Sequence, residues 1–264
     1  MAMFDFTLVM SASVDVCGMP GISHESVVNR EQQYVETLRF YSRQTCVPHI
    51  LFVDNSNWDL TRIERQVGHS EKISYLSLNE NTYPREWGKG YGEFLLMDRA
   101  VDKLVKDNGG RGGIVKVTGR FPIINIATMV KEFSERKNLQ LAVDVIDHPL
   151  YDWLRLGWAG HGCRTIIYAC TFDFYMRYLH GRYVEIHGSA GGMWGAETLM
   201  RDVWEKTRHR PGVYSRFRHE PCLAGYAGAV NHAWITANNY NGCLSKLKRG
   251  IRQACRYMFP GLWL

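Results

Sequence analysis

Two cations and a glycine lie close together in the stretch Lys116-Val117-Thr118-Gly119-Arg120. A lysine and an arginine can neutralise a diphosphate directly, the arginine through paired hydrogen bonds, while a glycine lets the backbone approach a ligand. Such a pair would stabilise a departing nucleoside diphosphate without a metal ion. The alternative interpretation is two exposed surface cations at the end of a strand.

A second stretch, Gly88-Lys89-Gly90-Tyr91-Gly92-Glu93, has three glycines at alternate positions before an apolar-periodic helix. Backbone N–H groups of such a loop can converge on an anion at the helix N-terminus, and Lys89 would add positive charge. The stretch matches neither the P-loop nor the dinucleotide-binding fingerprint. The alternative is a tight turn and a helix start, with Glu93 complementing the helix dipole.

Polar residues also follow the first two apolar runs of the chain. Ser11 comes after residues 4–10, and Asp54, Asn55 and Ser56 come after residues 49–53. An acidic side chain at such a position accepts hydrogen bonds from a ribose or a base. An Asx turn is the equally weighted alternative.

The residues that usually hold metal ions are scattered. The seven cysteines form no CxxC pair, and the ten histidines form no HxH or HxxxH pair. The sequence therefore predicts neither a disulfide framework nor a metal site, and no cofactor is expected.

The elements that must position these residues follow from hydrophobic periodicity. A β-α-β-β-α-β order predicts a mainly parallel, twisted sheet with helices on both faces, in an α/β Rossmann-type fold and a single compact domain. Ligands of such sheets bind beyond the carboxyl ends of the strands, where the polar stretches above lie. The expected strands are residues 4–10, 49–53, 73–78 and 113–117, and the expected helices are residues 26–42 and the stretch from Phe94 to residue 108.

The second half of the chain is less regular. Phe172, Tyr175, Met176 and Leu179 have the spacing of a helical packing face, and a glycine-rich segment at 188–195 runs into an expected helix at 197–207.

Composition is that of a globular protein: of 264 residues, 45% are hydrophobic and 22% are charged, which excludes a disordered chain. The net charge of +6 suits an anionic partner, such as a nucleoside diphosphate, an acidic membrane surface or a nucleic acid, without selecting one. No signal peptide and no apolar run long enough to span a bilayer is present, so a cytoplasmic location is expected.

Basic and apolar residues alternate in the C-terminal stretch 246–259, and Trp263 follows. A basic amphipathic helix of this kind can lie on an anionic bilayer. The alternative, slightly favoured, is a final helix that packs the side carrying Leu247, Ile251 and Met258 against the body of the protein.

Together, REQQY (30–34), VDNSN (53–57), GKGYGE (88–93) and KVTGR (116–120) resemble bacterial and viral glycosyltransferases that build lipopolysaccharide O-antigens, capsules and related surface glycans. The resemblance spans roughly residues 10–200. GKGYGE followed at a fixed distance by KxTGR is its specific part, and the segment Cys163-Arg164-Thr165 is similar to the second half of these enzymes.

The resemblance implies a GT-A-like fold, with KVTGR where GT-A enzymes commonly carry the acidic DxD motif that holds a divalent cation. The segment Cys163-Arg164-Thr165 lacks the acidic residue expected just before it. The resemblance places Arg30 and Asp54 near the nucleotide, Lys89 and Glu93 near the sugar or nucleotide, and Lys116 and Arg120 near the diphosphate. The full predicted donor site comprises Ser11, Arg30, Asp54, Asn55, Ser56, Lys89, Gly90, Gly92, Thr118, Gly119 and Arg164.

An inverting transferase needs a general base for the acceptor hydroxyl. Glu197 is the first choice, because it begins a helix after a glycine-rich segment; N-terminal dipole complementation is its alternative role. Asp144 and Asp147 are second choices, which could equally form a strand-end turn, and Glu93 is the third. The predicted catalytic residues are therefore Glu197, Lys116, Arg120 and Glu93.

The resulting hypothesis is a metal-independent, inverting glycosyltransferase that uses a nucleotide-sugar donor and a glycan or lipid-linked acceptor. Residues 1–125 would bind the donor, 126–240 the acceptor, and 241–264 would form the basic C-terminal segment. A phospho- or nucleotidyltransferase on the same scaffold, or a basic nucleic-acid-binding protein, is the alternative; no nucleic-acid partner is expected under the leading hypothesis.

Overall fold

The computed structural model describes residues 4–16, 26–146, 153, 162–186, 195–226, 233–235 and 243–259. The predicted residue Asp147, most of the segment 188–195 and Trp263 lie outside these ranges.

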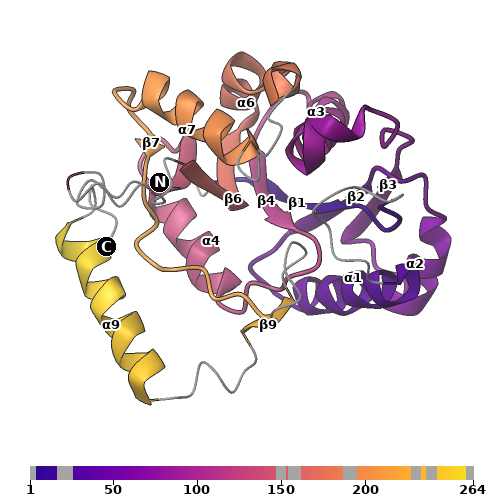
Figure 1. Ribbon diagram of the computed structural model, residues 1–264, viewed down its shortest axis with the longest axis horizontal. Helices are drawn as coiled ribbons and strands as arrows, with labels where there is room; N and C mark the ends of the chain where they lie inside the picture. Colours follow the sequence, from indigo (N-terminus) through magenta and orange to yellow (C-terminus); the bar gives the residue numbers. More distant parts are fainter. Residues whose placement is uncertain are drawn as a thin grey trace.

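A seven-stranded sheet forms the centre of the molecule, in the order β3-β2-β1-β4-β6-β5-β7 (Figure 1). Neighbouring strands are parallel except where β6 pairs antiparallel with both β4 and β5. Its strands are β1 (Phe6–Ala12), β2 (His49–Asp54), β3 (Ile73–Ser77), β4 (Gly113–Thr118), β5 (Leu141–Ile146), β6 (Gly162–Thr171) and β7 (Val213–Tyr214), and β8 (Gly225–Tyr226) pairs separately with β9 (Ala233–Ile235).

Helices cover both faces of this sheet (Figure 1). They are α1 (Val27–Ser42), α2 (Leu60–Val67), α3 (Gly88–Asn108), α4 (Ile126–Glu135), α6 (Phe172–Tyr178), α7 (Gly195–Thr207) and α9 (Cys243–Met258), with short 3-10 turns η1 (Arg85–Trp87) and η2 (Arg182–Ile186).

Alternation along the strands divides the core into two halves. Leu8 and Met10 of β1 pack with α1 and α4, whereas Val9 packs on the other face with α3, α6 and α7. Side chains of successive strand residues point to opposite faces, so a strand covered on both sides reads as a continuous apolar run. The predicted α/β class, with a mostly parallel sheet and helices on both faces, is confirmed.

Local signals set several helix ends as predicted. The Ser26 hydroxyl accepts a hydrogen bond from the backbone N–H of Asn29 and caps α1. Gly109, with a φ of +62°, ends α3 in the left-handed conformation that glycine adopts readily. The predicted face on α6 is correct for Phe172, Tyr175 and Leu179, which are buried, but Met176 is exposed.

The glycine-rich loop predicted at 88–93 is wrong, because these residues form the first turns of α3. Gly90 and Gly92 allow close packing. A Cβ on Gly92 would lie 2.2 Å from Tyr83 Oη, and one on Gly90 would lie 3.0 Å from the backbone nitrogen of Ala196 at the start of α7. Gly90 therefore lets α3 approach α7, and Gly92 makes room for Tyr83.

The C-terminal helix α9 also departs from the favoured expectation. Its residues Leu247, Ile251 and Met258 are exposed and do not pack against the body. Within the described residues, no helix is long and apolar enough to cross a membrane.

Candidate functional site

The carboxyl ends of β1, β2 and β4 meet at one edge of the sheet, as the predicted ligand site requires. The backbone N–H of Gly119 donates to the carbonyl oxygen of Ser11 at 2.9 Å, and that of Asn55 donates to Ala12 at 3.3 Å. A Cβ on Gly119 would lie 2.7 Å from that Ser11 oxygen. This glycine is therefore needed for contact between two strand ends, whatever ligand binds there.

Asp54 organises this edge. Its buried carboxylate accepts hydrogen bonds from the backbone N–H groups of Val14, Ser56 and Trp58 and from the Ser56 hydroxyl. Burial raises the pKa of Asp54, and these hydrogen bonds oppose that shift. The Asx-turn interpretation is correct, and both carboxylate oxygens already accept hydrogen bonds from the protein.

Two buried polar atoms nearby have no hydrogen-bond partner among the described residues, namely Arg30 Nη1 and Asn55 Oδ1. Other nitrogens of Arg30 donate to the carbonyl oxygen of Ser13 at 2.6 Å and to that of Val14 at 3.2 Å, so the guanidinium is held by the loop after β1. Buried polar groups are normally paired. One donor and one acceptor are therefore available at the ends of β1 and β2.

Lys116 is fully buried, which contradicts the alternative of an exposed surface cation. Its ammonium group forms an ion pair with Glu93 and donates to Thr118 Oγ1 at 3.2 Å and to the carbonyl oxygen of Thr165 at 2.6 Å. An ammonium has three N–H donors, and three acceptors use them. Lys116 has no hydrogen left to donate directly to a diphosphate.

Arg120 is buried as well, on the other side of the sheet. Its Nη1 donates to Gln33 Oε1 on α1 at 3.0 Å, and its guanidinium lies 5.5 Å from the centre of the Phe121 ring. Lys116 reaches Glu93 on α3, and α1 and α3 cover opposite faces. The structure therefore does not bring the two cations together as the predicted pair.

Four ionisable residues do converge, from α3, β4 and α7. We call Lys89, Glu93, Lys116 and Glu197 the carboxylate–lysine cluster. Burial raises the pKa of Glu197, and the negative charge of Glu93 raises it further, while its own backbone N–H, Lys89 and Lys116 lower it. A Cβ on Gly162 would lie 3.5 Å from the Glu197 Cβ, which places Glu197 beside the start of β6, at the edge where β4 ends.

This arrangement suits proton transfer. A carboxylate whose pKa is raised is a stronger base than an ordinary carboxylate, and such shifts are concentrated at functional sites. Lys89 is exposed at the N-terminus of α3 and adds positive charge near Glu197. The carboxylate–lysine cluster therefore combines an acid–base group with cations.

Asp144 and Arg164 form a separate network. The buried carboxylate of Asp144 is paired through both oxygens with Arg256 of α9, at 2.9 and 3.0 Å, and lies 3.7 Å from Arg164 Nη1. Arg164 also lies 3.9 Å from Glu220. A carboxylate held by a bidentate arginine is a poor general base, so this second-choice assignment for Asp144 loses its basis.

The contacts that sequence reasoning missed join residues far apart in the chain. Thr165 lies 49 positions from Lys116, and Arg256 lies 112 positions from Asp144. Only the antiparallel strand β6, which was not predicted, brings Thr165 next to β4. The sequence contained one signal for this contact: Lys116 lies within an apolar strand, and a buried ammonium group needs a partner inside the protein.

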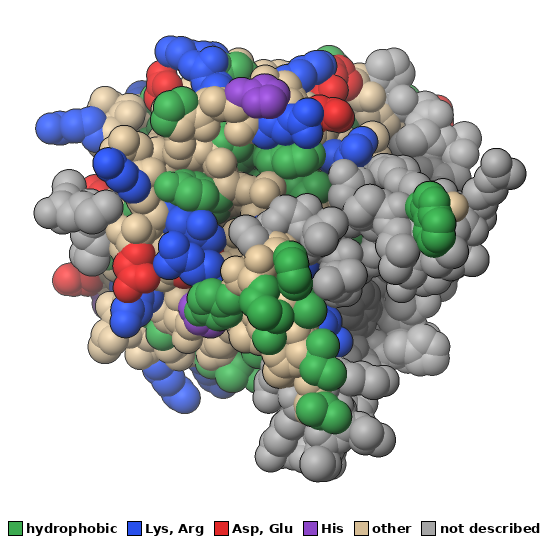
Figure 2. Space-filling model, turned by 90° about the vertical axis from the view of Figure 1, so that its left-hand side faces the viewer, with side chains coloured by type: hydrophobic (Ala, Val, Ile, Leu, Met, Phe, Trp, Pro, Cys, Tyr) green, Lys and Arg blue, Asp and Glu red, His purple; other side chains and the backbone are tan. Residues whose placement is uncertain are grey.

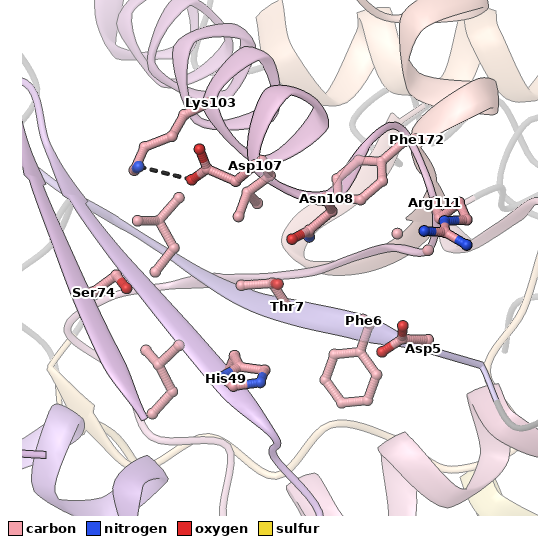
Figure 3. Close-up of a pocket in the computed structure, with 15 residues that line it drawn as sticks. Asp5, Phe6, Thr7, His49, Ser74, Lys103, Asp107, Asn108, Arg111 and Phe172 are labelled. Carbon is pink, nitrogen blue, oxygen red and sulfur yellow. Dashed lines mark hydrogen bonds and ion pairs between the residues drawn. The ribbon is translucent and has the colours of Figure 1, made fainter. Parts of the chain in front are cut away.

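A cavity of about 550 Å³ lies at the opposite edge of the sheet (Figure 3). The first residues of the strands line it together with the end of α3, where Lys103 Nζ pairs with Asp107 at 2.8 Å. None of the predicted site residues lines this cavity. Within the described ranges, no group of three or more His, Cys, Asp or Glu side chains could hold a metal ion.

No protein-family model and no curated protein matches the chain. Several solved structures are similar to it. A protein described as a nucleotide-diphospho-sugar transferase from Desulfovibrio desulfuricans G20 is 10% identical, with a TM-score of 0.45 over 78% of each chain. Mouse xyloside xylosyltransferase 1 is 10% identical, with a TM-score of 0.44 over 81% of this chain and 85% of that one.

A 4-diphosphocytidyl-2C-methyl-D-erythritol synthase is also similar, at 10% identity and a TM-score of 0.42 over 94% of this chain and 98% of that one. At these identities and TM-scores, the likenesses assign neither a family nor a reaction to this chain.

Proposed function

We propose that the protein is a GT-A-like glycosyltransferase that moves a monosaccharide from a nucleoside-diphosphate sugar to a hydroxyl of a glycan or lipid-linked acceptor. The observation that carries this proposal is Glu197, a half-buried carboxyl with a raised pKa beside Lys89 and Lys116. It lies at the edge of the sheet where α/β proteins bind ligands.

The donor nucleotide would occupy the ends of β1 and β2. Arg30 Nη1 offers a hydrogen-bond donor there and Asn55 Oδ1 an acceptor, both buried and without partners among the described residues. A nucleotide, which presents both acceptors and donors, would satisfy them. Residues 1–125 would then form the donor half and residues 126–240 the acceptor half, with 241–264 as the C-terminal segment.

In the proposed reaction, Glu197 takes the proton of the acceptor hydroxyl. The hydroxyl oxygen attacks the anomeric carbon, and the bond from that carbon to the diphosphate oxygen breaks with inversion of configuration. Lys89 stabilises the departing diphosphate, since it is exposed and close enough to lower the pKa of Glu197. Lys116 acts indirectly, because its three N–H groups are engaged and it holds Glu93 in place.

We propose that this reaction needs no divalent cation at the end of β4. The stretch Lys116–Arg120 contains no carboxylate, and a buried ammonium with its three acceptors occupies the side of β4 that faces α3. These residues do not fit a cation of the kind that a DxD motif holds. A cytoplasmic role in surface polysaccharide or glycoprotein glycan synthesis is the setting we propose.

A thermal-shift and turnover screen tests this function. The protein is incubated with nucleoside diphosphates and their sugars, with manganese or with a chelator, and diphosphate release is measured with glycan acceptors. At 100-fold excess over the Kd, a ligand stabilises the fold by about 2.7 kcal/mol, which raises the Tm by several degrees.

We expect one nucleotide family to raise the Tm and its sugar to be turned over in the presence of the chelator. Strict dependence on manganese would overturn the metal-independent mechanism. Pyrophosphate release from a nucleoside triphosphate would show a nucleotidyltransferase instead. Salt-sensitive oligonucleotide binding without any nucleotide-sugar binding would show a nucleic-acid-binding protein.

A further inference from the structure

The described side chains of the C-terminal helix α9 contact the body of the protein through one side of the helix. Arg256, which is buried, pairs with Asp144 and donates to the carbonyl oxygen of Phe217 at 3.0 Å. One turn earlier, Arg252 pairs with Glu220 at 2.9 Å. Polar and charged groups therefore make these contacts with the body, the reverse of an amphipathic helix that buries its apolar face.

The opposite side of α9 is apolar and exposed. Leu247, Ile251, Ala254 and Met258 are spaced four, three and four residues apart, which is the spacing of one helix face. Their large members are 59%, 56% and 63% exposed. At 100° per residue this face lies about half a turn from Arg256. Figure 2, which looks onto α9, shows hydrophobic side chains gathered over the helix.

The charge of α9 indicates what covers this apolar face. The helix contains no Asp or Glu, and its basic residues are Lys246, Lys248, Arg249, Arg252 and Arg256. A second copy of the chain would place two such helices against each other in a symmetric contact, so that like charges would repel. An anionic bilayer accepts the apolar side chains and attracts the cations.

We propose that α9 docks the protein on an anionic membrane surface, with the face formed by Leu247, Ile251 and Met258 inserted at the headgroup level. This docking depends on α9 alone and not on the reaction. If the proposed function holds, docking would also bring a lipid-linked acceptor near the active edge. The contacts of α9 lead towards this edge. Arg256 binds Asp144, which lies opposite Arg164 in the sheet. The next residue, Thr165, accepts a hydrogen bond from Lys116.

Vesicle co-sedimentation tests the proposal with the full chain. Wild type is mixed with phosphatidylcholine vesicles and with vesicles containing one quarter phosphatidylglycerol, at low and high salt. The test variant carries Leu247→Ser, Ile251→Ser and Met258→Ser. Its matched control carries Val28→Ser, Met176→Ser and Val184→Ser, three exposed apolar residues on other elements. All six side chains are exposed, so thermal melting should show both variants folded.

We expect wild type and the control variant to bind the anionic vesicles, less strongly at high salt and weakly without phosphatidylglycerol. The α9 variant should lose about tenfold or more in partitioning. The proposal is overturned by wild type that ignores anionic vesicles, by equal losses in both variants, or by a dimer in light scattering that only the α9 variant breaks. Diphosphate release from a soluble donor should be equal in all three proteins, so a failure of docking is distinct from a failure of the proposed reaction.

Discussion

Asp54, which is buried, and Glu197, which is half-buried, are carboxyl groups near the same edge of the sheet, yet their surroundings differ. Asp54 accepts hydrogen bonds from four donors that tie the ends of β1 and β2 together. The pKa of Glu197 is lowered by its own backbone N–H and by two lysines, and it is raised by the like negative charge of Glu93. Burial raises the pKa of both.

The difference separates a carboxylate whose hydrogen bonds stabilise the fold from one that we propose as a general base. Removing Asp54 would leave its donors without partners in the interior, so its charge is tied to stability. Partial burial makes the charged form of Glu197 costly to stability and makes its carboxylate more basic, a combination typical of active sites. Substitutions at the two positions should therefore act on different quantities.

The largest effect should come from Glu197→Gln. If Glu197 is the general base, turnover should fall by about 10²- to 10⁴-fold, because no group then accepts the proton of the acceptor hydroxyl. Glu205→Gln, an exposed glutamate on the same helix, is the matched control and should leave turnover unchanged. Equal rates for both variants would remove Glu197 from the mechanism.

The same variant should be more stable than wild type at neutral pH. The folded state holds the proton of Glu197 more tightly than the unfolded chain does, because its folded pKa is raised above 4.5. The free energy of unfolding therefore falls as pH rises from about the unfolded pKa through the folded one. Glu197→Gln should lack that fall, which denaturant titrations at several pH values would show.

Asp54→Ala should lower the free energy of unfolding by about 3 kcal/mol, because its four donors lose their acceptor in a buried site. Urea unfolding measures this loss. Asp59→Ala, which removes the exposed N-cap of α2, should cost less. A loss at Asp54 no greater than at Asp59 would contradict the structural role.

Lys116→Met should destabilise the fold by about 2 to 3 kcal/mol, since it breaks an ion pair whose lysine is fully buried. Glu93 is 24% exposed, and water can therefore reach the carboxylate that remains. Adding Glu93→Gln should restore part of the loss in urea unfolding. If the double variant is less stable than the single one, the pair is not the source of the effect.

The smallest effect should be a shift in pH dependence. Glu93→Gln removes a charge that raises the pKa of Glu197, so the acid limb of the turnover profile should move to lower pH. Lys89→Met removes a charge that lowers this pKa and should move the limb to higher pH, in addition to the loss of turnover that its proposed contact with the diphosphate implies. Shifts in the same direction would show that the limb does not report Glu197.

Much of the first half of the fold was predictable from local signals. The strands β1, β2, β3 and β4 were predicted to within about two residues. Of these, β1, β2 and β4 are buried on both faces and therefore need continuous apolar sequence. The ends of α1 and α3 followed from Ser26 and Gly109, whose effects on the backbone are local. Sequence reasoning missed α2, α4 and the strand β6.

The site was less predictable, because partners distant in sequence determine its chemistry. Lys116, Glu93 and Glu197 were candidates from their types and positions, and the structure brings them near one another. The sequence did not predict that Lys116 faces α3 while Arg120 faces α1. The direction of Lys116 depends on the alternation of side chains along β4, and that of Arg120 depends on the loop after β4.

The sequence by itself determined the α/β class, the strand ends where polar residues gather and the basic, amphipathic nature of the C-terminal helix. These follow from periodicity and composition, which act over a few residues. Only the tertiary structure decided that Lys116 is neutralised internally, that Asp144 holds α9 and that the apolar face of α9 is exposed. Burial and charge pairing join residues up to 112 positions apart, and no local pattern contains that information.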